Sequence, residues 1–394
     1  MDIETDVLVI GAGPSGSIAT RTIAQNGIDV LLIDKKSEIG TPKRCAEGIL
    51  RSTLDELGIR ADKRWIAREI KGIEIVSPSN KKLVLDEDNF ELPDTAYILE
   101  RKIFDKTLVM DAIRFGAKVM IKTKANNIKR VKDGFLVKAT SLGKEIQIFT
   151  KIIIGADGPE SKVGRMVGLK SNTSLNNMAS CAQYEMVNVN MDDMNHVRVH
   201  IGSVCPGGYV WIFPKGDDIA NVGLGILKSH TDKTAKHFLD SFIESNQDVV
   251  NAQCVEMNVG GDPIGGLIEQ RYDDNIMIVG DAAGFVDPLT GDGIRTAMLS
   301  GKFAGDVAVK SIKNGDYSKK FLKEYYDLTE EHVGKSFNRF NKIKEFLLTL
   351  DDKSLDNIVE DILKSDLENI DLKSLFKIII KASPKSIFKL NKLF

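Results

Sequence analysis

The sequence predicts an α/β protein: a discontinuous, doubly wound domain on a parallel sheet, an antiparallel-sheet domain, and a helical C-terminal region. Three largely apolar runs, at 7–10, 151–155 and 275–279, each end in a glycine or lead directly into one, as is typical of buried strands in such parallel sheets. The β-type runs within 178–227 succeed one another without a helix, which indicates an antiparallel sheet. The run at 275–279 therefore returns the chain to its first domain, and helical patterns follow beyond residue 314.

Length and composition bound the class of protein. The chain has 394 residues, 42% hydrophobic and 28% charged, with a net charge of −2, which is ordinary for a globular protein of two or three domains. This balance gives no field that would attract nucleic acid, so we expect no nucleic-acid partner. No run approaches 18 apolar residues and the first strand begins within six residues, so we expect a cytoplasmic chain without a membrane span. The four cysteines form no CxxC pair and the five histidines are dispersed, so we expect neither a metal site nor disulfides.

The first element predicts a βαβ unit that binds a dinucleotide. An apolar strand leads into Gly11-x-Gly13-x-x-Gly16, a helical pattern follows, and a second strand at 30–33 ends in Asp34. Gly11 permits a tight turn, Gly13 lets the backbone approach a pyrophosphate, and Gly16 allows the helix to pack closely on the strand. The helix N-terminus favours phosphates, and Asp34 is placed to accept hydrogen bonds from an adenosine ribose.

A polar connection follows and reaches Arg44-Cys45-Ala46-Glu47-Gly48, ahead of a short helix at 50–57. A loop at this position can return over the cofactor, and the small residues Ala46 and Gly48 would let its backbone approach a flat ring. The alternative is an ordinary loop with one buried thiol, Cys45.

The next elements interrupt the first domain with β insertions. Strands are expected within 70–86 and at 97–99, a helix from Glu100 to about residue 115, a strand at 119–121 and a β-meander at 123–138.

The second apolar run ends in the turn Asp157-Gly158. Asp157 either caps the helix that follows or, because it lies at the carboxyl end of a parallel strand, borders a ligand.

The expected antiparallel sheet contains the run Tyr209-x-Trp211-x-Phe213-Pro214. Its three aromatic side chains share one face of a strand, since side chains alternate along a strand. They either belong to the hydrophobic core or line a large apolar pocket.

The third apolar run ends in Gly280-Asp281 and continues through Gly291 and Gly293 into a helix that begins at Ile294. The two glycines would let this helix N-terminus come close to a ligand. Helix N-termini favour negative charge, which suits a reduced flavin.

Two stretches near the C-terminus could meet lipid. Residues 373–394 contain six lysines and no acid among apolar residues, a pattern that suits either an anionic membrane surface or a helix that covers the domain core. Lys335 and Arg339 lie on an expected helix, where they either contact a lipid phosphate or belong to a solvated face.

The order and spacing of these signals resemble the FAD-dependent hydroxylase and reductase class of flavoproteins. Over essentially its whole length the chain is similar to the geranylgeranyl reductase family, through Arg44–Gly48 and through Tyr209–Pro214, which looks like that family's YxWxFP signature. Its size and its Cys45 loop resemble the archaeal members that act on digeranylgeranylglycerophospholipids.

The resemblance implies FAD, bound with its adenosine at the first βαβ unit and its flavin ring between the Cys45 loop and the helix after Gly293. Asp34 stands where the family more usually has glutamate, one methylene longer, but it can make the same ribose contacts. The residues expected to contact the cofactor are Gly11, Gly13, Ser15, Gly16, Asp34, Cys45, Ala46, Gly48, Arg101, Ala125, Asp157, Asp281, Gly291, Gly293 and Ile294.

The implied reaction saturates isoprenoid C=C bonds by hydride transfer from reduced flavin and protonation. Cys45 is the catalytic candidate, with a steric or positional role, because a thiol of pKa about 8.5 is a poor acid for an alkene. Substrate contacts are expected from Tyr209, Trp211, Phe213 and Lys335. A flavin monooxygenase of the aromatic-hydroxylase type, distinguished by its need for oxygen, and a non-enzymatic prenyl-lipid binding protein are the alternatives.

The expected partners are the lipid and an electron donor, which is a ferredoxin, a deazaflavin or NADPH, with peripheral contact at the inner face of the membrane. The expected domains are an FAD-binding domain (1–72, 98–172 and 268–315), a substrate domain (73–97 and 173–267) and a C-terminal helical region (316–394).

Overall fold

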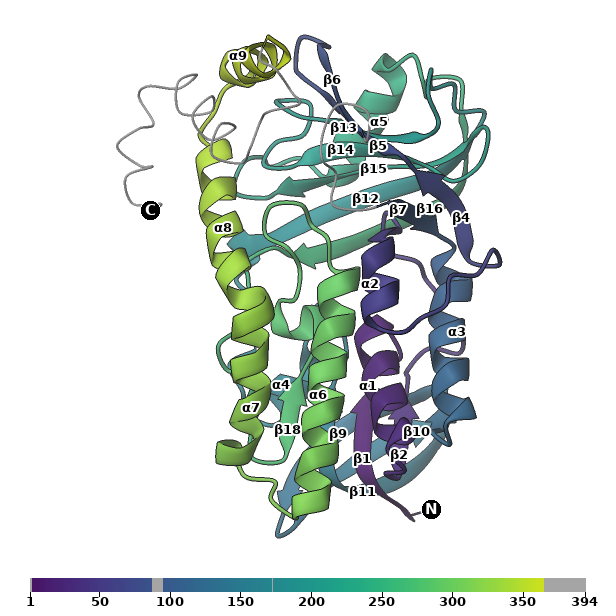
Figure 1. Cartoon of the computed structure of the whole chain (residues 1–394), viewed down its shortest axis with the longest axis vertical. Coiled ribbons are helices and arrows are strands. Elements are labelled where there is room, and N and C mark those ends of the chain that lie inside the picture. The colour runs from purple at the N-terminus through teal and green to yellow at the C-terminus, as the bar shows by residue number, and fades with distance from the viewer. Residues whose placement is uncertain (1, 87–94, 172, 365–394) are drawn as a thin grey trace. The chain divides into compact units, whose positions relative to one another are not determined.

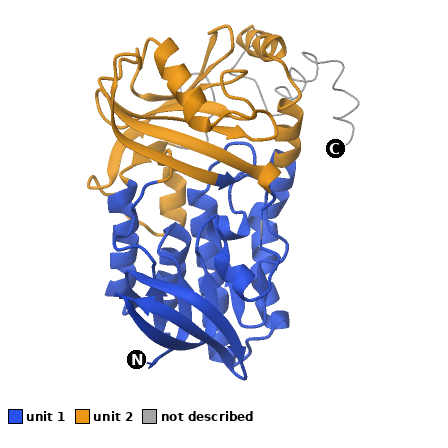
Figure 2. Cartoon of the chain, turned by 180° about the vertical axis from the view of Figure 1, so that it is seen from behind, with its two compact units in different colours: residues 1–43, 101–174, 262–340 blue, residues 44–100, 175–261, 341–394 orange. Residues whose placement is uncertain are grey.

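The computed structural model describes residues 2–86, 95–171 and 173–364 (Figure 1). The chain divides into two compact units (Figure 2). Unit 1 comprises residues 1–43, 101–174 and 262–340, and unit 2 comprises residues 44–100, 175–261 and 341–394. The basic stretch at 373–394 lies outside the described residues.

These units divide the chain differently from the expected domains. Residues 44–72 belong to unit 2, because β3 (Gly48–Leu50) and β4 (Ile66–Ile70) both pair with β7 (Ala96–Leu99) in a three-stranded antiparallel sheet. The described helices beyond residue 315 are divided between the two units, since unit 1 ends at Phe340 and unit 2 resumes at Asn341. Strands of three to five residues carry too little periodicity to reveal such pairings.

Unit 1 is built on an eight-stranded mixed sheet, in which β18, β11, β1, β2 and β8 run parallel in that order. β10 and β9 extend it as an antiparallel meander, and β17 pairs antiparallel with β18. The bounds are β1 Asp2–Ile10, β2 Val30–Ile33, β8 Lys118–Met120, β9 Thr123–Val131, β10 Gly134–Ser141, β11 Lys144–Gly155, β17 Tyr272–Asp273 and β18 Ile276–Ile278.

Strand β11 connects the parallel and antiparallel parts of this sheet. Its residues 144–150 pair with β10, and its residues 153–155 pair with β18. The chain therefore returns to the parallel sheet at β18 after a long excursion, as the apolar run at 275–279 predicted.

The helices of unit 1 pack partly through glycine. A Cβ atom at Gly301 of α6 would lie 2.1 Å from the carbonyl oxygen of Ser15, and one at Gly305 would lie 2.8 Å from Cβ of Thr22, so α6 approaches α1 at backbone distance. The bounds are α1 Pro14–Gln25, α3 Arg101–Arg114, α4 Lys162–Met166, α6 Ile294–Asn314 and α7 Lys319–Thr329, with a π-helical turn at Glu330–Gly334. α8 (Lys335–Leu347) belongs to unit 1 up to Phe340 and to unit 2 from Asn341.

Unit 2 contains a seven-stranded sheet in the order β16, β12, β15, β14, β13, β5, β6. β12 to β13 form an antiparallel run, whereas β5 pairs parallel with β13, because β5 comes from an earlier part of the chain rather than from a hairpin. The sequence pattern did not predict β16. The bounds are β5 Gly72–Val76, β6 Lys82–Asp86, β12 Met178–Val187, β13 His196–His200, β14 Tyr209–Pro214, β15 Ile219–Leu227 and β16 Gln253–Pro263.

The two faces of β14 have different neighbours. Val210 and Ile212 are fully buried in the hydrophobic core that Leu239 and Phe242 of α5 (Ala235–Ser245) also join. The alternation of side chains along the strand therefore places the three aromatic residues of β14 on the opposite face. Unit 2 further contains α2 (Arg51–Glu56), and α9 (Asp352–Leu363), which packs against β6. None of the described helices combines the length and apolarity that a bilayer crossing needs.

Candidate cofactor and substrate site

The turn between β1 and α1 accepts only glycine at two positions. Gly11 has φ +115°, and a Cβ there would lie 2.1 Å from the carbonyl oxygen of Ala156. A Cβ at Gly16 would lie 1.9 Å from the carbonyl oxygen of Gly11. By contrast, no atom lies within 4 Å of a Cβ built at Gly13, so the space beside Gly13 is open to a ligand.

The start of α1 suits a phosphate. Gly13 is its N-cap, no side chain caps it, and Pro14 occupies the first turn. The backbone N–H groups of a helix's first turn have no partner inside the helix, and they bind anions with the help of the helix dipole.

Asp34 is buried, and its carboxylate orders the turn. Oδ2 accepts a hydrogen bond from the N–H of Ala12 at 2.7 Å, and Oδ1 accepts one from the N–H of Lys36 at 2.8 Å. Each carboxylate oxygen has a second lone pair, so both bonds are compatible with a further bond from a ribose hydroxyl.

The three glycine turns of unit 1 meet at the carboxyl edge of the parallel sheet. Gly11, at the end of β1, contacts Ala156, at the end of β11. Gly280, after β18, has φ +63°, and a Cβ there would lie 2.6 Å from the hydroxyl oxygen of Ser15. The turns surround the start of α1, which is where ligands bind in open sheets of this type.

Asp157 serves as a helix cap. Its Oδ2 accepts hydrogen bonds from the N–H groups of Lys162 (2.5 Å) and Val163 (3.0 Å) at the start of α4, as the capping interpretation expected. Its Oδ1 is buried and has no hydrogen-bond partner among the described residues. Burial raises the pKa of Asp157, and the two N–H bonds oppose this rise. An orphaned acceptor at the end of β11 fits a hydroxyl donor of a ligand.

Asp281 borders the start of α6. Its Oδ1 lies 3.7 Å from the position that a Cβ of Gly293 would occupy. Burial raises the pKa of Asp281, whereas the positive charge of Arg101 lowers it. Arg101 also forms a bidentate ion pair with Asp105, at 2.8 and 2.9 Å, which fixes its guanidinium at the first turn of α3.

The loop before α6 differs from the expectation in one respect. The N–H of Ile294 donates to Oδ1 of Asp292 at 3.2 Å, so this N–H, which we expected to face a flavin, is already used within the loop. Gly291 has φ +70°, and its N–H donates to the carbonyl of Asp287 at 2.9 Å, which closes the loop.

Two carboxyl groups that sequence reasoning missed accompany Asp281. Burial together with the charges of Asp281 and Asp292 raises the pKa of Asp262 to about 8. Burial also raises the pKa of Asp292 to about 6. Spacing along the chain gave no sign of them, because Asp262 lies near the end of β16, 30 residues before Asp292 in the loop that precedes α6.

Ala125 and Lys335 are predicted site residues that lie outside the three glycine turns. Ala125 lies in β9, opposite Ala139 at a β-bulge. Lys335 and Arg339 are exposed on α8, which both the solvated-face and the lipid-phosphate interpretations expect.

The loop Cys45–Gly48 belongs to unit 2 and is fastened by the sheet of that unit. Nε2 of Gln183 donates to the carbonyl of Cys45 at 3.0 Å, and Nε1 of Trp211 donates to Oε1 of Gln183 at 2.9 Å. A Cβ at Gly48 would lie 3.3 Å from the ring of Phe213. The N–H of Glu47 donates to Sγ of Cys45 at 3.2 Å, and Cys45 is half-buried.

The three aromatic residues of β14 have distinct contacts. Trp211 is buried over Gly223, where a Cβ would lie 2.5 Å from the indole, and the ring of Tyr209 lies edge-on to it with centroids 5.9 Å apart. Tyr209 and Phe213 are half-buried. Phe213 therefore lies beside the Cys45 loop, and Trp211 is linked to this loop through Gln183.

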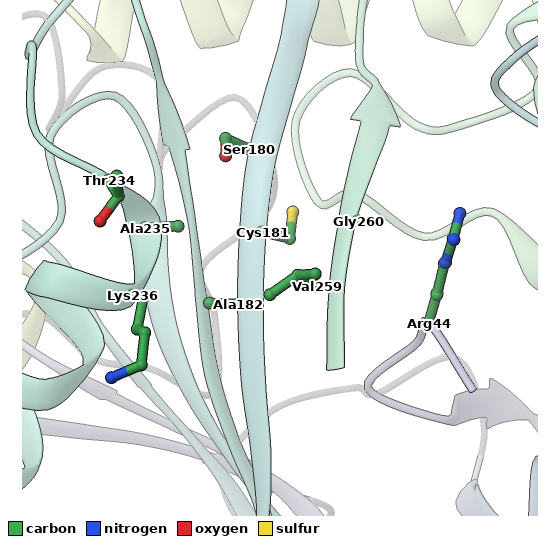
Figure 3. A pocket seen from close by; sticks show the side chains of 9 residues that line it. All are labelled: Arg44, Ser180, Cys181, Ala182, Thr234, Ala235, Lys236, Val259 and Gly260. Atoms are coloured by element: carbon green, nitrogen blue, oxygen red, sulfur yellow. The ribbon is translucent and has the colours of Figure 1, made fainter. Parts of the chain in front are cut away.

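A pocket of about 380 Å³ lies in unit 2 beside this loop (Figure 3). Figure 3 shows Cys181 on β12, between the start of α5, which carries Lys236, and the loop that carries Arg44. Val259 and Gly260 of β16 also line the pocket.

A parallel sheet with three converging glycine turns is typical of dinucleotide-binding proteins, and this chain joins it to a largely antiparallel sheet, as many two-domain flavoproteins do. The comparisons with known proteins give the family within this class. Residues 9–45 match the model of the NAD(P)-binding Rossmann-like domain, and residues 177–261 match that of the geranylgeranyl reductase catalytic domain.

Full-length relatives agree with these matches. The chain is 55% identical to digeranylgeranylglycerophospholipid reductase 2 of Methanosphaera stadtmanae, with both chains covered completely. It is 49% identical to digeranylgeranylglycerophospholipid reductase 1 of Methanothermobacter thermautotrophicus, over 100% of this chain and 99% of the relative. A solved structure from Thermoplasma acidophilum, described as geranylgeranyl bacteriochlorophyll reductase-like, is 35% identical with a TM-score of 0.93 and complete coverage of both chains. The chain belongs to the digeranylgeranylglycerophospholipid reductase family.

Proposed function

We propose that this protein is an FAD-dependent reductase that saturates C=C bonds of the geranylgeranyl chains of archaeal-type digeranylgeranylglycerophospholipids. The observation that carries the proposal is the convergence of three glycine turns on the start of α1, in a chain that is 55% identical to a reductase of that name. The family supplies the substrate class, and the turns supply a place for the cofactor.

The residues of unit 1 fit FAD. The open space beside Gly13 and the uncapped start of α1 suit the pyrophosphate, and Asp34 suits the adenosine ribose. The unsatisfied Oδ1 of Asp157 suits a hydroxyl donor, and Asp281 with Gly293 borders the space before α6. We include Ser15, Arg101, Ala125 and Gly291 in the cofactor site on the family resemblance.

Bound FAD, once reduced, supplies the hydride for one carbon of the alkene, and the other carbon takes a proton. The protein's own residues hold the cofactor, exclude water and orient the isoprenoid chain. We assign Cys45 a positional role, because its thiol accepts a hydrogen bond from the N–H of Glu47 and is a poor acid for an alkene. An external donor, which is a ferredoxin, a deazaflavin or NADPH, returns two electrons after each cycle.

The substrate is an anionic lipid with long apolar chains. Tyr209 and Phe213, which are half-buried, are the residues of β14 that we assign to its apolar wall. Arg44 and Lys236 border the pocket in unit 2 and have the charge that a lipid phosphate requires. For residues 373–394, the six lysines support peripheral contact with an anionic membrane surface.

An anaerobic turnover experiment tests the proposal. Purified protein is reconstituted with FAD, reduced with dithionite and mixed with digeranylgeranylglycerophospholipid, and the lipid is analysed by mass spectrometry. The proposal expects successive gains of two hydrogens per double bond, without oxygen. A product that has gained an oxygen atom, formed only in air, would instead identify a monooxygenase. Bound lipid without any redox change would identify a binding protein.

A further inference from the structure

The loop Cys45–Gly48 is held through its own backbone carbonyls. The carbonyl of Cys45 accepts from Gln183 at 3.0 Å, and that of Ala46 accepts from Nδ2 of Asn221 at 3.2 Å. The carbonyl of Glu47 accepts from the N–H of Leu99 at 2.9 Å. Three successive peptide groups are therefore oriented by partners outside the loop, two of them amide side chains of the large sheet of unit 2.

This arrangement also holds a strained residue. Glu47 has φ +78°, in the left-handed region that a non-glycine side chain adopts at a cost, and its side chain is fully buried. Its carboxylate accepts from Asn221 at 2.8 Å and pairs with the ammonium of Lys215 at 2.8 Å. Lys215 also pairs with Glu100 at 2.9 Å and with Glu185 at 3.1 Å. Backbone strain persists only where surrounding contacts over-determine it, and here they do.

The signature strand acts in the same network. Trp211 donates its indole N–H to Oε1 of Gln183, which fixes the side-chain amide of Gln183. Nε2 of the same amide then donates to the carbonyl of Cys45. Gln183 is buried, so its amide has one orientation that satisfies both bonds. Lys215 directly follows the signature and anchors Glu47, two residues beyond Cys45.

We propose that Gln183, Asn221 and Lys215 are positioning residues that hold the Cys45–Gly48 loop in its working conformation, and that Trp211 acts through Gln183 rather than as a wall for the substrate. This inference rests on the proposed function only in taking the loop to be part of the reductase site. The conformation of the loop itself is a property of unit 2.

Gln183→Leu tests the proposal, because it removes both hydrogen bonds of the side-chain amide and replaces it with an apolar side chain of similar size. Its matched control is Tyr184→Phe, which removes a side-chain hydrogen bond from the next residue of the same strand, the 2.8 Å bond to Asp240. Trp211→Phe is the second variant if Gln183→Leu does not fold, since it removes the indole N–H and keeps an aromatic ring.

The readouts are the rate at which iodoacetamide alkylates Cys45, followed by peptide mass spectrometry, and the kinetics of lipid reduction. Exposed Cys254 is the internal standard for alkylation. We expect Gln183→Leu and Trp211→Phe to change the Cys45 rate severalfold and to lower kcat about tenfold, with KM for the lipid little changed. We expect the alkylation rate of Cys254 to stay at its wild-type value in all variants. Tyr184→Phe should keep both the wild-type alkylation rate of Cys45 and the wild-type kinetics of lipid reduction.

If both variants keep the wild-type alkylation rate of Cys45 and the wild-type kcat, the positioning role is wrong. It is also wrong if the alkylation rate of Cys254 changes as much as that of Cys45, because the substitutions would then have loosened the whole fold. Alkylation does not depend on turnover. A changed Cys45 rate in a protein without reductase activity would therefore refute the proposed function and leave the positioning role standing.

Discussion

Replacing Lys215 with methionine should destabilise the protein strongly, because it leaves a buried carboxylate without its cation. The side chain of Lys215 is 2% exposed, and that of its partner Glu47 is 0% exposed. Burial lowers the pKa of Lys215, but Glu47 and Glu100 raise it by more, so the ammonium stays charged in the fold.

The magnitude follows from the exposure of each carboxylate. Glu100 and Glu185 are 40% and 22% exposed and can be hydrated after the substitution, so Glu47 dominates the cost. Removing one partner of a buried ion pair costs about 3–5 kcal/mol. Adding Glu47→Gln removes the orphaned charge and keeps an acceptor for Asn221, so the double variant should recover most of this loss.

Urea unfolding of the wild type and both variants measures the effect, followed for unit 2 by fluorescence of Trp65 and Trp211. Wild-type stability of Lys215→Met, or a double variant as unstable as the single one, would refute the reasoning.

Three further predictions concern unit 1. Gly13→Ala should fold as the wild type does, since a Cβ there meets no atom within 4 Å, yet bind FAD at least about tenfold more weakly in a fluorescence titration. If Gly13→Ala binds FAD as tightly as the wild type does, the pyrophosphate does not lie beside Gly13. Asp34→Ala should weaken FAD binding by about 2–3 kcal/mol, while Asp34→Glu retains most of it; an unaffected Asp34→Ala would contradict the ribose assignment. Because the folded pKa of Asp262 is about 8, above its unfolded value, unfolding free energy should fall between pH 4 and 8 by at most about 1.4 kcal/mol per pH unit. Asp262→Asn should flatten this slope in urea titrations, and an unchanged slope would assign it to other groups.

The sequence alone predicted the strands of the parallel sheet in unit 1 and the glycine turns that follow them. The constraints there are local, because Gly11 and Gly16 are required by backbone contacts within one turn and with the end of one neighbouring strand. The convergence of the three glycine turns follows from parallel topology, which brings the carboxyl ends of strands to one edge. Capping by Asp157 was one of the two interpretations that the spacing left open, and the structure shows it.

Tertiary structure decided what could not be read from spacing. Gln183 lies 138 residues from Cys45, and Asn221 lies 174 residues from Glu47, so no periodicity links them. The sequence left open whether the aromatic residues of β14 belong to the core or to a pocket wall. The strand order and register settled which face they share, because Val210 and Ile212 occupy the core and leave Trp211 facing Gln183.

The same distinction explains the unit boundaries. Residues 44–72 follow the dinucleotide unit in sequence, yet their short strands pair with β7 and place the Cys45 loop in unit 2. Sequence by itself determined the glycine turns at the ends of the parallel strands, since those turns depend on short-range backbone geometry. Only the folded chain determined which distant side chains hold the Cys45 loop, since hydrogen bonds and ion pairs depend on positions in space that strand pairing alone creates.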